Sequence, residues 1–377
     1  MGLGGPTGEG DIGGAATPDR GAATGAGTTG GAAAPDTGGE DTTVIRVTAP
    51  GRVNLIGDHT DYMGGLAMPM AIQMATVITG TRTEGRILLT SDGAEGTVQI
   101  DLPAQDPAST SPAWGRYVAA VASVLGTTIG FTGEVVSSIP VGSGLSSSAA
   151  LEVATALALG DDGSPVEVSR RTQAAELLAT SVPCGIMDQL AITSGLEGHA
   201  LLMDFATLDV TPVAIPDDMC FWVVHSGQQR TLAGSAYAER RAQCESAEAL
   251  IGPLRSASTA ELESITDPNV RSRARHVRDE CRRVLDFADA LSAGDVVGAG
   301  ELMVMSHMSL RKDFDVSTEA LDELVERLCA TPGVHGARLT GAGFGGCVVA
   351  LADPGVLLDG WHVTPSGGAK VEVLADP

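Results

Sequence analysis

The chain has 377 residues, of which 43 % are hydrophobic and only 3 % aromatic, so we expect about two domains with largely aliphatic cores. A formal net charge of -24 argues against nucleic acid as a ligand, because duplex binding needs clustered Lys and Arg. An anionic membrane surface would repel the same charge, and no apolar run approaches the ~20 residues of a membrane span.

Six cysteines are scattered along the chain without a C-x-x-C pair, so neither a zinc site nor a redox motif is predicted. The N-terminus lacks an apolar stretch after a basic start, which argues against a signal peptide. We therefore expect a cytoplasmic protein whose thiols are reduced.

Residues 1–42 are mostly Gly, Ala, Thr and Pro with a few acids, and they show no hydrophobic periodicity. Such a segment cannot bury enough apolar surface to offset its ordering entropy. We predict a disordered tail up to residue 42, with ordered structure from Thr43 onward.

The pattern that follows the tail is led by strands. The β-rich run 44–47 precedes a loop marked by Gly and Pro at 49–51. Two helices are expected at 149–159 and 166–180, the first opened by a cluster of serines that suits helix capping. Further strands are expected at 76–81, 86–90, 97–101, 134–137, 199–204 and 221–224.

The second half of the chain is led by helices. Apolar residues at three- and four-residue spacing predict helices at 235–250, 271–291, 302–311 and 318–329. Short strands are expected at 337–339 and 347–351. The change of pattern predicts two lobes, residues 43–210 and 211–377, with the boundary within 207–215.

A loop rich in Gly and Ser follows a predicted strand and opens a predicted helix. Glycines let the backbone approach an anion, and the first helical turn offers unpaired N–H groups. An ordinary helix-capping loop has the same composition, so both interpretations remain open. The loop is not a P-loop, because no Lys-Ser or Lys-Thr follows, and it lacks the third Rossmann glycine. Its residues are Gly142, Ser143, Gly144, Leu145, Ser146, Ser147 and Ser148.

A second glycine-rich loop, 341–346, lies between two short predicted strands. Its four glycines in six residues exceed what one tight turn requires. This composition favours close approach of the backbone to a ligand.

The densest polar chemistry lies in residues 51–62. Arg52, Asp58, His59 and Asp61 alternate there with apolar residues. A solvated loop can have this composition, but an apolar segment threaded through charges favours charges that face a cleft.

These motifs together resemble a known family. GRVNLIGDHTDY (51–62) resembles the galactokinase signature, while PVGSGLSSSAALE (140–152) and RLTGAGFGGC (338–347) resemble the second and third motifs of the GHMP sugar and metabolite kinase superfamily. The resemblance runs in order from about Ala49 to Leu351. Three further stretches resemble galactokinases in particular: PCGIMDQ (183–189), SAYAERRAQCE (235–245) and SHMSLRKDFDVS (306–317).

The resemblance implies an α+β, two-lobed GHMP kinase fold. The lobe of residues 43–210 would contain a left-handed β-α-β unit, the lobe of residues 211–377 would be ferredoxin-like, and the active site would lie between them. The implied reaction phosphorylates α-D-galactose at the C1 hydroxyl, with ATP as co-substrate and Mg²⁺ as cofactor. The implied protein is a cytoplasmic enzyme, expected to be a monomer.

Two alternatives remain. One is a related sugar 1-kinase that acts on N-acetylgalactosamine or arabinose. The other is a non-catalytic galactose sensor, which Ser148-Ala149 and Asp188 disfavour because sensors of the family lose residues of the second motif. Asp58 stands where Glu is commoner and Met63 where a polar residue is frequent, so these departures bear on the identity of the sugar.

The family's residue roles transfer to matching positions. Asp188 corresponds to the catalytic acidic residue, and Arg52 to the arginine that orients it. Ser148 and Glu176 correspond to magnesium ligands. By residue type alone, Glu176 is more often a surface acid, Asp188 a helix cap and Tyr237 a core aromatic. The sugar ligands implied are Asp58, His59, Thr60, Asp61, Gly185 and Tyr237, and the ATP contacts are Ser91 with Gly142, Ser143, Gly144, Leu145, Ser146, Ser147 and Ser148.

Overall fold

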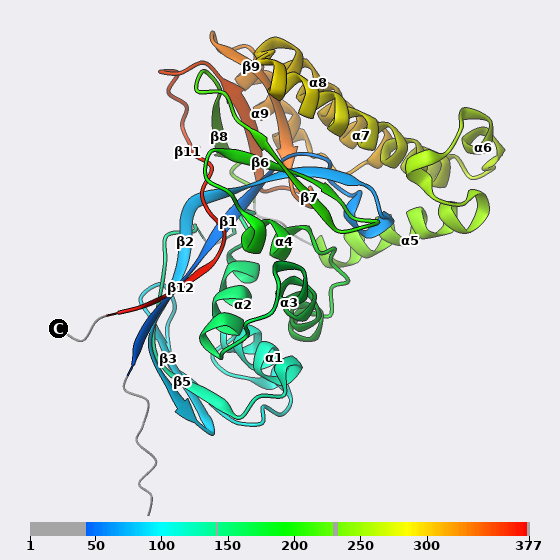
Figure 1. The fold of residues 1–377 in the computed structure, drawn as a ribbon. Coiled ribbons are helices and arrows are strands. Elements are labelled where there is room, and N and C mark those ends of the chain that lie inside the picture. The colour runs from blue at the N-terminus through cyan, green and yellow to red at the C-terminus, as the bar shows by residue number, and fades with distance from the viewer. Residues whose placement is uncertain (1–42, 141, 229–232, 375–377) are drawn as a thin grey trace, which may run out of the picture. The chain divides into compact units, whose positions relative to one another are not determined.

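Two long antiparallel strands form the centre of the first sheet (Figure 1). The computed structural model describes residues 43–140, 142–228 and 233–374, so the expected tail lies outside it. Strand β1 (Val44–Ile56) pairs with β2 (Leu66–Glu84), and the strand order is β12-β1-β2-β5-β3-β4. The other strands are β3 (Arg86–Ser91), β4 (Val98–Asp101), β5 (Ile129–Ser137) and β12 (Lys370–Val373).

Strand β1 does not stop where the sequence indicated. The loop expected at 49–51 is wrong, because the strand continues through Pro50 and Gly51 to Ile56. A register shift between Pro50 and Gly51 absorbs the proline, which has no N–H to donate. A Cβ at Gly51 would lie 2.7 Å from the carbonyl oxygen of Leu145, so glycine permits the glycine/serine loop to approach the strand closely.

Four helices cover one face of the first sheet (Figure 1). Helix α2 packs against both central strands. Helix α3 begins with a capping box between Ser164 and Glu167 and with Pro165 in its first turn. The helices are α1 (Gly115–Leu125), α2 (Ser147–Ala158), α3 (Pro165–Thr180) and α4 (Met187–Ser194).

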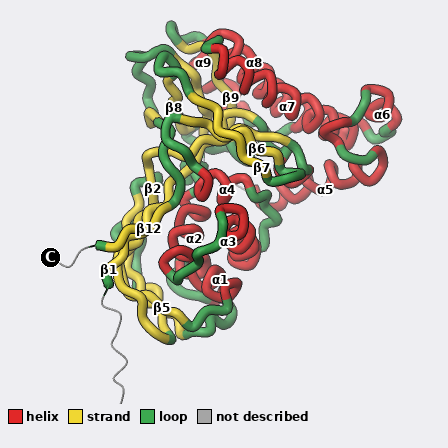
Figure 2. Tube along the Cα trace, viewed as in Figure 1, coloured by secondary structure: helices red, strands yellow, loops and turns green. Residues whose placement is uncertain are grey.

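The second sheet is antiparallel and has the order β11-β8-β10-β9. Its strands are β8 (Cys220–His225), β9 (Val334–Thr340), β10 (Cys347–Ala352) and β11 (Trp361–Val363). Helices α8 and α9 pack on β9, and Figure 2 shows both helices beside that strand. The helices are α5 (Ala233–Ile251), α6 (Thr259–Ser264), α7 (Pro268–Ala293), α8 (Val296–Ser309) and α9 (Glu319–Cys329).

The chain crosses between the two sheets more than once. A hairpin of β6 (His199–Asp204) and β7 (Asp209–Ala214) joins β2, and the expected boundary at 210/211 falls inside β7. After β11 the chain returns to the first sheet, where β12 pairs with β1. All described residues accordingly belong to one compact unit.

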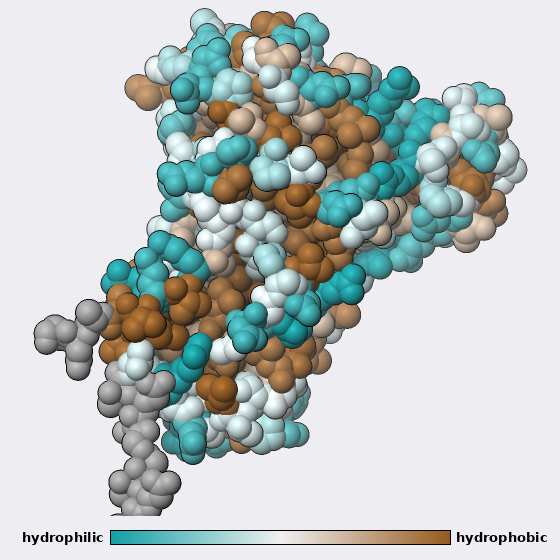
Figure 3. Space-filling model, viewed as in Figure 1, coloured by the Kyte–Doolittle hydropathy of each residue, from teal (hydrophilic) through white to brown (hydrophobic). Residues whose placement is uncertain are grey.

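The edge strand β12 leaves apolar side chains on the surface. Val371 is 43 % exposed and Val373 is 70 % exposed. Figure 3 shows brown, hydrophobic areas on the face of the molecule in view. No helix among the described residues is long and apolar enough to cross a membrane.

Candidate active site

A cavity of about 270 Å³ contains nearly all of the predicted catalytic and sugar-binding residues. Of those predictions, only Thr60 is not in its lining. The lining combines β1 and the turn after it, helix α3, the segment before α4 and the first turn of α4, helix α5 and the loop after β9. It consists of Arg52, Asp58, His59, Asp61, Glu176, Val182, Cys184, Gly185, Met187, Asp188, Tyr237, Gly341 and Ala342.

Arg52 and Asp188 converge in this cavity. The guanidinium of Arg52 donates from Nε to Oδ1 of Asp188 at 2.7 Å and from Nη2 to Oδ2. Its Nη1 donates to the carbonyl oxygen of Gly144 at 2.7 Å. Asp188 lies in the first turn of α4, where the helix dipole favours a negative charge. The two-pronged ion pair fixes the orientation of the carboxylate.

Ser146 joins the glycine/serine loop to the same carboxylate. It is the N-cap residue of α2, but its backbone is left-handed with φ 63° and its side chain makes no cap hydrogen bond. The hydroxyl instead donates to Oδ2 of Asp188 at 2.5 Å. The helix-capping interpretation is therefore wrong for Ser146. The loop expected to hold phosphate is bonded directly to the expected catalytic carboxylate.

The rest of this loop combines two left-handed glycines with the start of a helix. Gly142 and Gly144 adopt positive φ values of 77° and 75°, and a Cβ at Gly142 would meet nothing within 4 Å. The hydroxyl of Ser143 donates to the carbonyl of Pro140 at 2.6 Å, and Leu145 is fully buried. Ser147 and Ser148 form the first turn of α2. The unpaired N–H groups of this turn are suited to a phosphate.

Ser148 lies beside Glu176, as the resemblance implied. The Ser148 hydroxyl donates to Oε1 of Glu176 at 3.1 Å, which places two oxygen donors from α2 and α3 together. Ser91 is different. It lies at the end of β3, in a separate cavity of about 530 Å³ lined by residues 90–97. The structure does not bring Ser91 into the cavity that holds the other predicted residues.

Asp61 and Gly185 are in close contact. A Cβ at Gly185 would lie 1.5 Å from Oδ2 of Asp61, so only glycine allows this carboxylate its place. Burial, and then the negative charge of Asp188, raise the pKa of Asp61 to about 6. Burial, and then the charge of Asp61, raise the pKa of the Tyr237 phenol well above its usual value. Asp61 is an acceptor in its charged form, whereas Tyr237 remains a neutral donor.

His59 forms an aromatic wall of the cavity. Its ring contacts Tyr62, Tyr237 and Phe314, with the Phe314 centroid at 4.5 Å. Burial and the neighbouring His276 lower the pKa of His59 to about 3, so the ring is neutral at physiological pH. Nε2 lies 3.2 Å from the carbonyl oxygen of Ala342 and Nδ1 3.1 Å from the Tyr62 hydroxyl. Because a carbonyl only accepts, Nε2 carries the proton.

Thr60 lies behind the cavity wall. It is fully buried, and its hydroxyl lies 2.9 Å from the carbonyl oxygen of Gly57 and 2.7 Å from that of Leu66. These bonds hold the turn that carries Asp58 and His59. The sugar-ligand role expected for Thr60 has no support from its position.

Three family profiles match the chain. Residues 36–82 match the galactokinase galactose-binding signature, residues 116–196 the N-terminal domain of GHMP kinases, and residues 287–357 their C-terminal domain. The galactokinase of Homo sapiens is 42 % identical over 328 residues, which cover 82 % of this chain and 84 % of the relative. The galactokinase of Thermococcus kodakarensis is also 42 % identical, covering 82 % and 90 %. The chain belongs to the galactokinase family.

Solved structures agree with this assignment. The crystal structure of Lactococcus lactis galactokinase complexed with galactose superposes with a TM-score of 0.80 at 31 % identity, covering 88 % of this chain and 96 % of that one. A mevalonate kinase shares the fold, with a TM-score of 0.59 at 21 % identity. The expected α+β GHMP kinase fold is confirmed, and the protein is a sugar kinase that uses ATP.

Sequence analysis gave no role to Gln189 or Glu152, although the Gln189 amide joins Glu152 to Glu176. The side-chain amide of Gln189 donates to Oε2 of Glu176 at 2.7 Å and to Oε2 of Glu152 at 3.3 Å. Burial, then the charge of Asp188, raise the pKa of Glu176, while burial and Glu176 raise that of Glu152. Glu152 follows Ser148 by four residues, one helical turn, which was the available signal.

Arg338 was also missed, although it opens the third motif. It is fully buried, and its Nη2 donates to Oδ2 of Asp58 at 2.5 Å. The amide of Gly341, the first glycine of the second loop, donates to Oδ1 of the same carboxylate at 2.9 Å. A Cβ at Gly343 would lie 2.5 Å from the carbonyl oxygen of Val316. At Gly341 and Gly343, the backbone of this loop does come close to another group, and that group is another part of the chain.

Proposed function

We propose that the protein transfers the γ-phosphoryl group of ATP to the C1 hydroxyl of α-D-galactose. The observation that carries the proposal is the junction of Arg52, Asp188 and Ser146. A carboxylate oriented by an arginine faces the cavity, and a serine of the phosphate loop is bonded to that carboxylate. We expect the C1 hydroxyl of the sugar and the γ-phosphoryl group of ATP to meet at these three residues.

In the proposed mechanism, Asp188 accepts or polarises the proton of the attacking hydroxyl. A positioned base of this kind contributes about 10²–10⁴ to a rate. Arg52 holds the Asp188 carboxylate in one orientation. It also places a positive charge near the reacting oxygen atoms, on which negative charge develops. Phosphoryl transfer otherwise depends on alignment and charge neutralisation, which the loop at 142–148 and the start of α2 supply.

Ser148 and Glu176 are the residues that would hold Mg²⁺. Their oxygen atoms, 3.1 Å apart, suit a hard cation that prefers oxygen ligands. Across the part of the chain that the structure describes, no group of three or more His, Cys, Asp or Glu side chains could hold a metal. This fits an ion that binds with one or two carboxylates and the substrate's phosphates. When bound, it would neutralise charge on the phosphates.

Recognition of the sugar falls to Asp61, Tyr237, Asp58 and the backbone at Gly185. They combine carboxylate and backbone groups with a neutral phenol donor in one cavity. A pocket of this kind rejects an analogue that leaves a buried polar group unpaired. An epimer that moves one hydroxyl would meet this penalty, so we expect strong preference among sugars.

We place the activity in the cytoplasm and expect a monomer. The six cysteines are scattered along the sequence without a C-x-x-C pair, which suits a reducing compartment. Size-exclusion chromatography with light scattering would check the oligomeric state.

An ADP-release assay over a panel of sugars tests the function. We expect galactose to have a far higher kcat/KM than N-acetylgalactosamine, arabinose or glucose. The Asp188→Asn variant controls for contaminating kinases, since it should lose the activity. Equal rates on all sugars would overturn the proposed substrate, and galactose binding without ADP release would instead support a sensor.

A further inference from the structure

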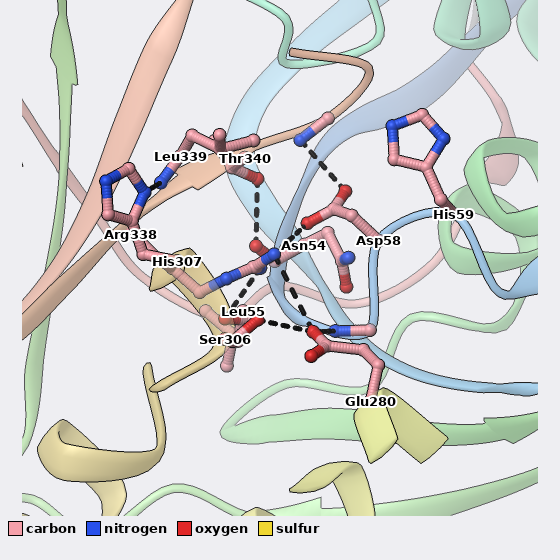
Figure 4. Close-up of polar contacts among 12 residues, drawn as sticks. Asn54, Leu55, Asp58, His59, Glu280, Ser306, His307, Arg338, Leu339 and Thr340 are labelled. Carbon is pink, nitrogen blue, oxygen red and sulfur yellow. Dashed lines mark hydrogen bonds and ion pairs between the residues drawn. The ribbon is translucent and has the colours of Figure 1, made fainter. Parts of the chain in front are cut away.

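A cluster of buried charges adjoins the proposed sugar cavity through Asp58, which lines that cavity; the contacts of the cluster are drawn in Figure 4. The side chains of Arg338 and Glu280 are 0 % exposed, and that of Asp58 is 2 % exposed. The Arg338 guanidinium contacts both carboxylates, Asp58 at 2.5 Å and Glu280 at 3.9 Å. Of the three, only Asp58 also lines the cavity.

Residues of β9 hold consecutive parts of the signature segment. Nη1 of Arg338 donates to the carbonyl oxygen of Leu55 at 3.1 Å, while its Nη2 donates to the Asp58 carboxylate. The hydroxyl of Thr340 donates to the carbonyl oxygen of Asn54 at 2.8 Å. The two prongs of one guanidinium therefore fix both the strand end and the carboxylate that follows it.

Residues of α7 hold the same segment from another direction. The amide of Gly57 donates to Oε1 of Glu280 at 3.0 Å, and Ser306 donates to the same oxygen. His276 contributes Nε2 at 3.1 Å from the carbonyl oxygen of Asp58. Burial raises the pKa of Glu280, but Arg283, His276 and Arg338 outweigh it and hold the pKa at about 2. Glu280 is therefore charged and balances the arginines.

A cluster of buried charges has a large desolvation penalty, so it adds little net stability to a fold. Well-packed apolar residues of similar volume are often as stabilising as buried ion pairs or more so. What the charges supply is a single geometry for residues 54–58, because each bond is directional. Both carboxylate oxygens of Asp58 already accept a hydrogen bond, so the side chain is not free to turn toward a hydroxyl by its own rotation.

We propose that Arg338 is a positioning residue for sugar recognition, acting through the Asp58 carboxylate. Arg338 and the Gly341 amide fix one lone pair on each carboxylate oxygen. The remaining lone pairs point a charged acceptor at a sugar hydroxyl, and a sugar that lacks that hydroxyl leaves the acceptor unpaired. The inference rests on the proposed sugar site.

The test is a double-mutant cycle of Arg338→Lys and Asp58→Asn. Lysine keeps the charge but cannot reach Leu55 and Asp58 with one rigid fork. We expect Arg338→Lys to raise the galactose KM and the calorimetric Kd without ATP at least about tenfold. The ATP KM should stay within about twofold and kcat within about threefold, since chemistry is untouched. Adding Arg338→Lys to Asp58→Asn should raise the galactose KM by no more than about twofold further.

Arg171→Lys is the matched control, because Arg171 makes a two-pronged ion pair with Asp161 away from the cavity. It should leave every constant unchanged. If Asp58→Asn leaves the galactose KM unchanged, the sugar role of Asp58 fails. If Asp58→Asn raises KM but Arg338→Lys does not, only the positioning role fails. Additive effects in the double variant would also overturn it.

Should Arg338→Lys not fold, the pair Arg338→Met with Asp58→Asn replaces it. This double variant removes both charges of the Arg338–Asp58 pair, while Glu280 keeps its ion pair with Arg283, so no buried charge is left unpaired. A galactose KM equal to that of Asp58→Asn alone supports the proposal, and a further rise of tenfold or more overturns it.

Discussion

Two carboxylates of one cavity are each held by an arginine, yet they are held differently. Asp188 has a side chain 27 % exposed, and both Arg52 and Ser146 of the glycine/serine loop are bonded to it. Asp58 is 2 % exposed and accepts from the fully buried Arg338 and from a backbone amide. A reacting carboxylate must remain reachable by the hydroxyl whose proton it takes. A recognition carboxylate needs only a fixed direction.

This contrast has a kinetic consequence. Changes around Asp188 should lower kcat, because they remove interactions made in the transition state. Changes around Asp58 should raise the sugar KM with kcat nearly intact, because they remove binding common to ground and transition states. Changes at Asp188, Glu176, Tyr237 and Asp61 test this separation of effects on kcat from effects on the sugar KM, in order of decreasing expected size.

Asp188→Ala should have the largest effect. Removal of the base should lower kcat by about 10²–10⁴. ATP binding, measured by calorimetry, should stay nearly normal because the loop at 142–148 is unchanged. Asp204→Asn is the control, since Asp204 makes a comparable two-pronged pair with Arg255 outside the cavity. Near-normal turnover in Asp188→Ala would remove Asp188 as the base.

Glu176→Gln should come next. Loss of a charged oxygen ligand should weaken Mn²⁺ binding to the enzyme–ATP complex by at least about tenfold, as electron paramagnetic resonance titration would measure. The sugar KM should hardly change, because Glu176 serves the nucleotide side. Glu167→Gln on the same helix is the control, as Glu167 caps α3 at the surface. Unchanged metal affinity would contradict the assignment of Glu176.

Tyr237→Phe should have a smaller effect, confined to the sugar. One hydrogen bond is worth about 0.5–1.5 kcal/mol, so the galactose KM should rise roughly three- to tenfold. The ATP KM should stay constant. Tyr117→Phe provides the control, because the Tyr117 hydroxyl bonds Arg116 on α1 outside the cavity. A constant galactose KM would take Tyr237 out of the sugar site.

Much of the fold was predictable because its signals are local. The apolar stripes of α7 and α9 and the alternation in the strands depend on residues close in sequence. Every strand and helix expected within the described residues overlaps an observed element of that type. The wrong loop at 49–51 shows the limit of local signals. Pro50 and Gly51 are turn residues, but pairing along the whole of β2 keeps them in a strand.

The candidate site also has a part that local signals predicted and a part that they did not. The residues that line the cavity were found through motifs, because each motif is a continuous run. The bonds of Ser146 to Asp188, and of Arg338 to Asp58, join residues 42 and 280 positions apart. No periodicity or composition encodes such a partner. Those partners could be identified only after the chain was folded.

Asp61 lines the same cavity as Asp58 and Asp188, and the charge of Asp188 acts on it. Its titration therefore gives the last and smallest test of the comparison. Burial and the Asp188 charge raise its pKa to about 6, from the ordinary 3.8. The folded protein thus holds this proton more tightly than the unfolded chain, and this group's contribution to stability falls as pH rises from about 4 to about 6. Sugar binding should change in the opposite direction, because the charged form is the acceptor.

The galactose kcat/KM should therefore fall about twofold at pH 6 relative to pH 8, and further below it. Asp61→Asn should abolish this inflection. Asp188→Asn should move the inflection, measured by galactose binding, to lower pH, since it removes the second cause of the shift. An inflection that stays at pH 6 in Asp188→Asn would mean that the two carboxylates do not interact, and the recognition wall would then be electrostatically independent of the catalytic pair.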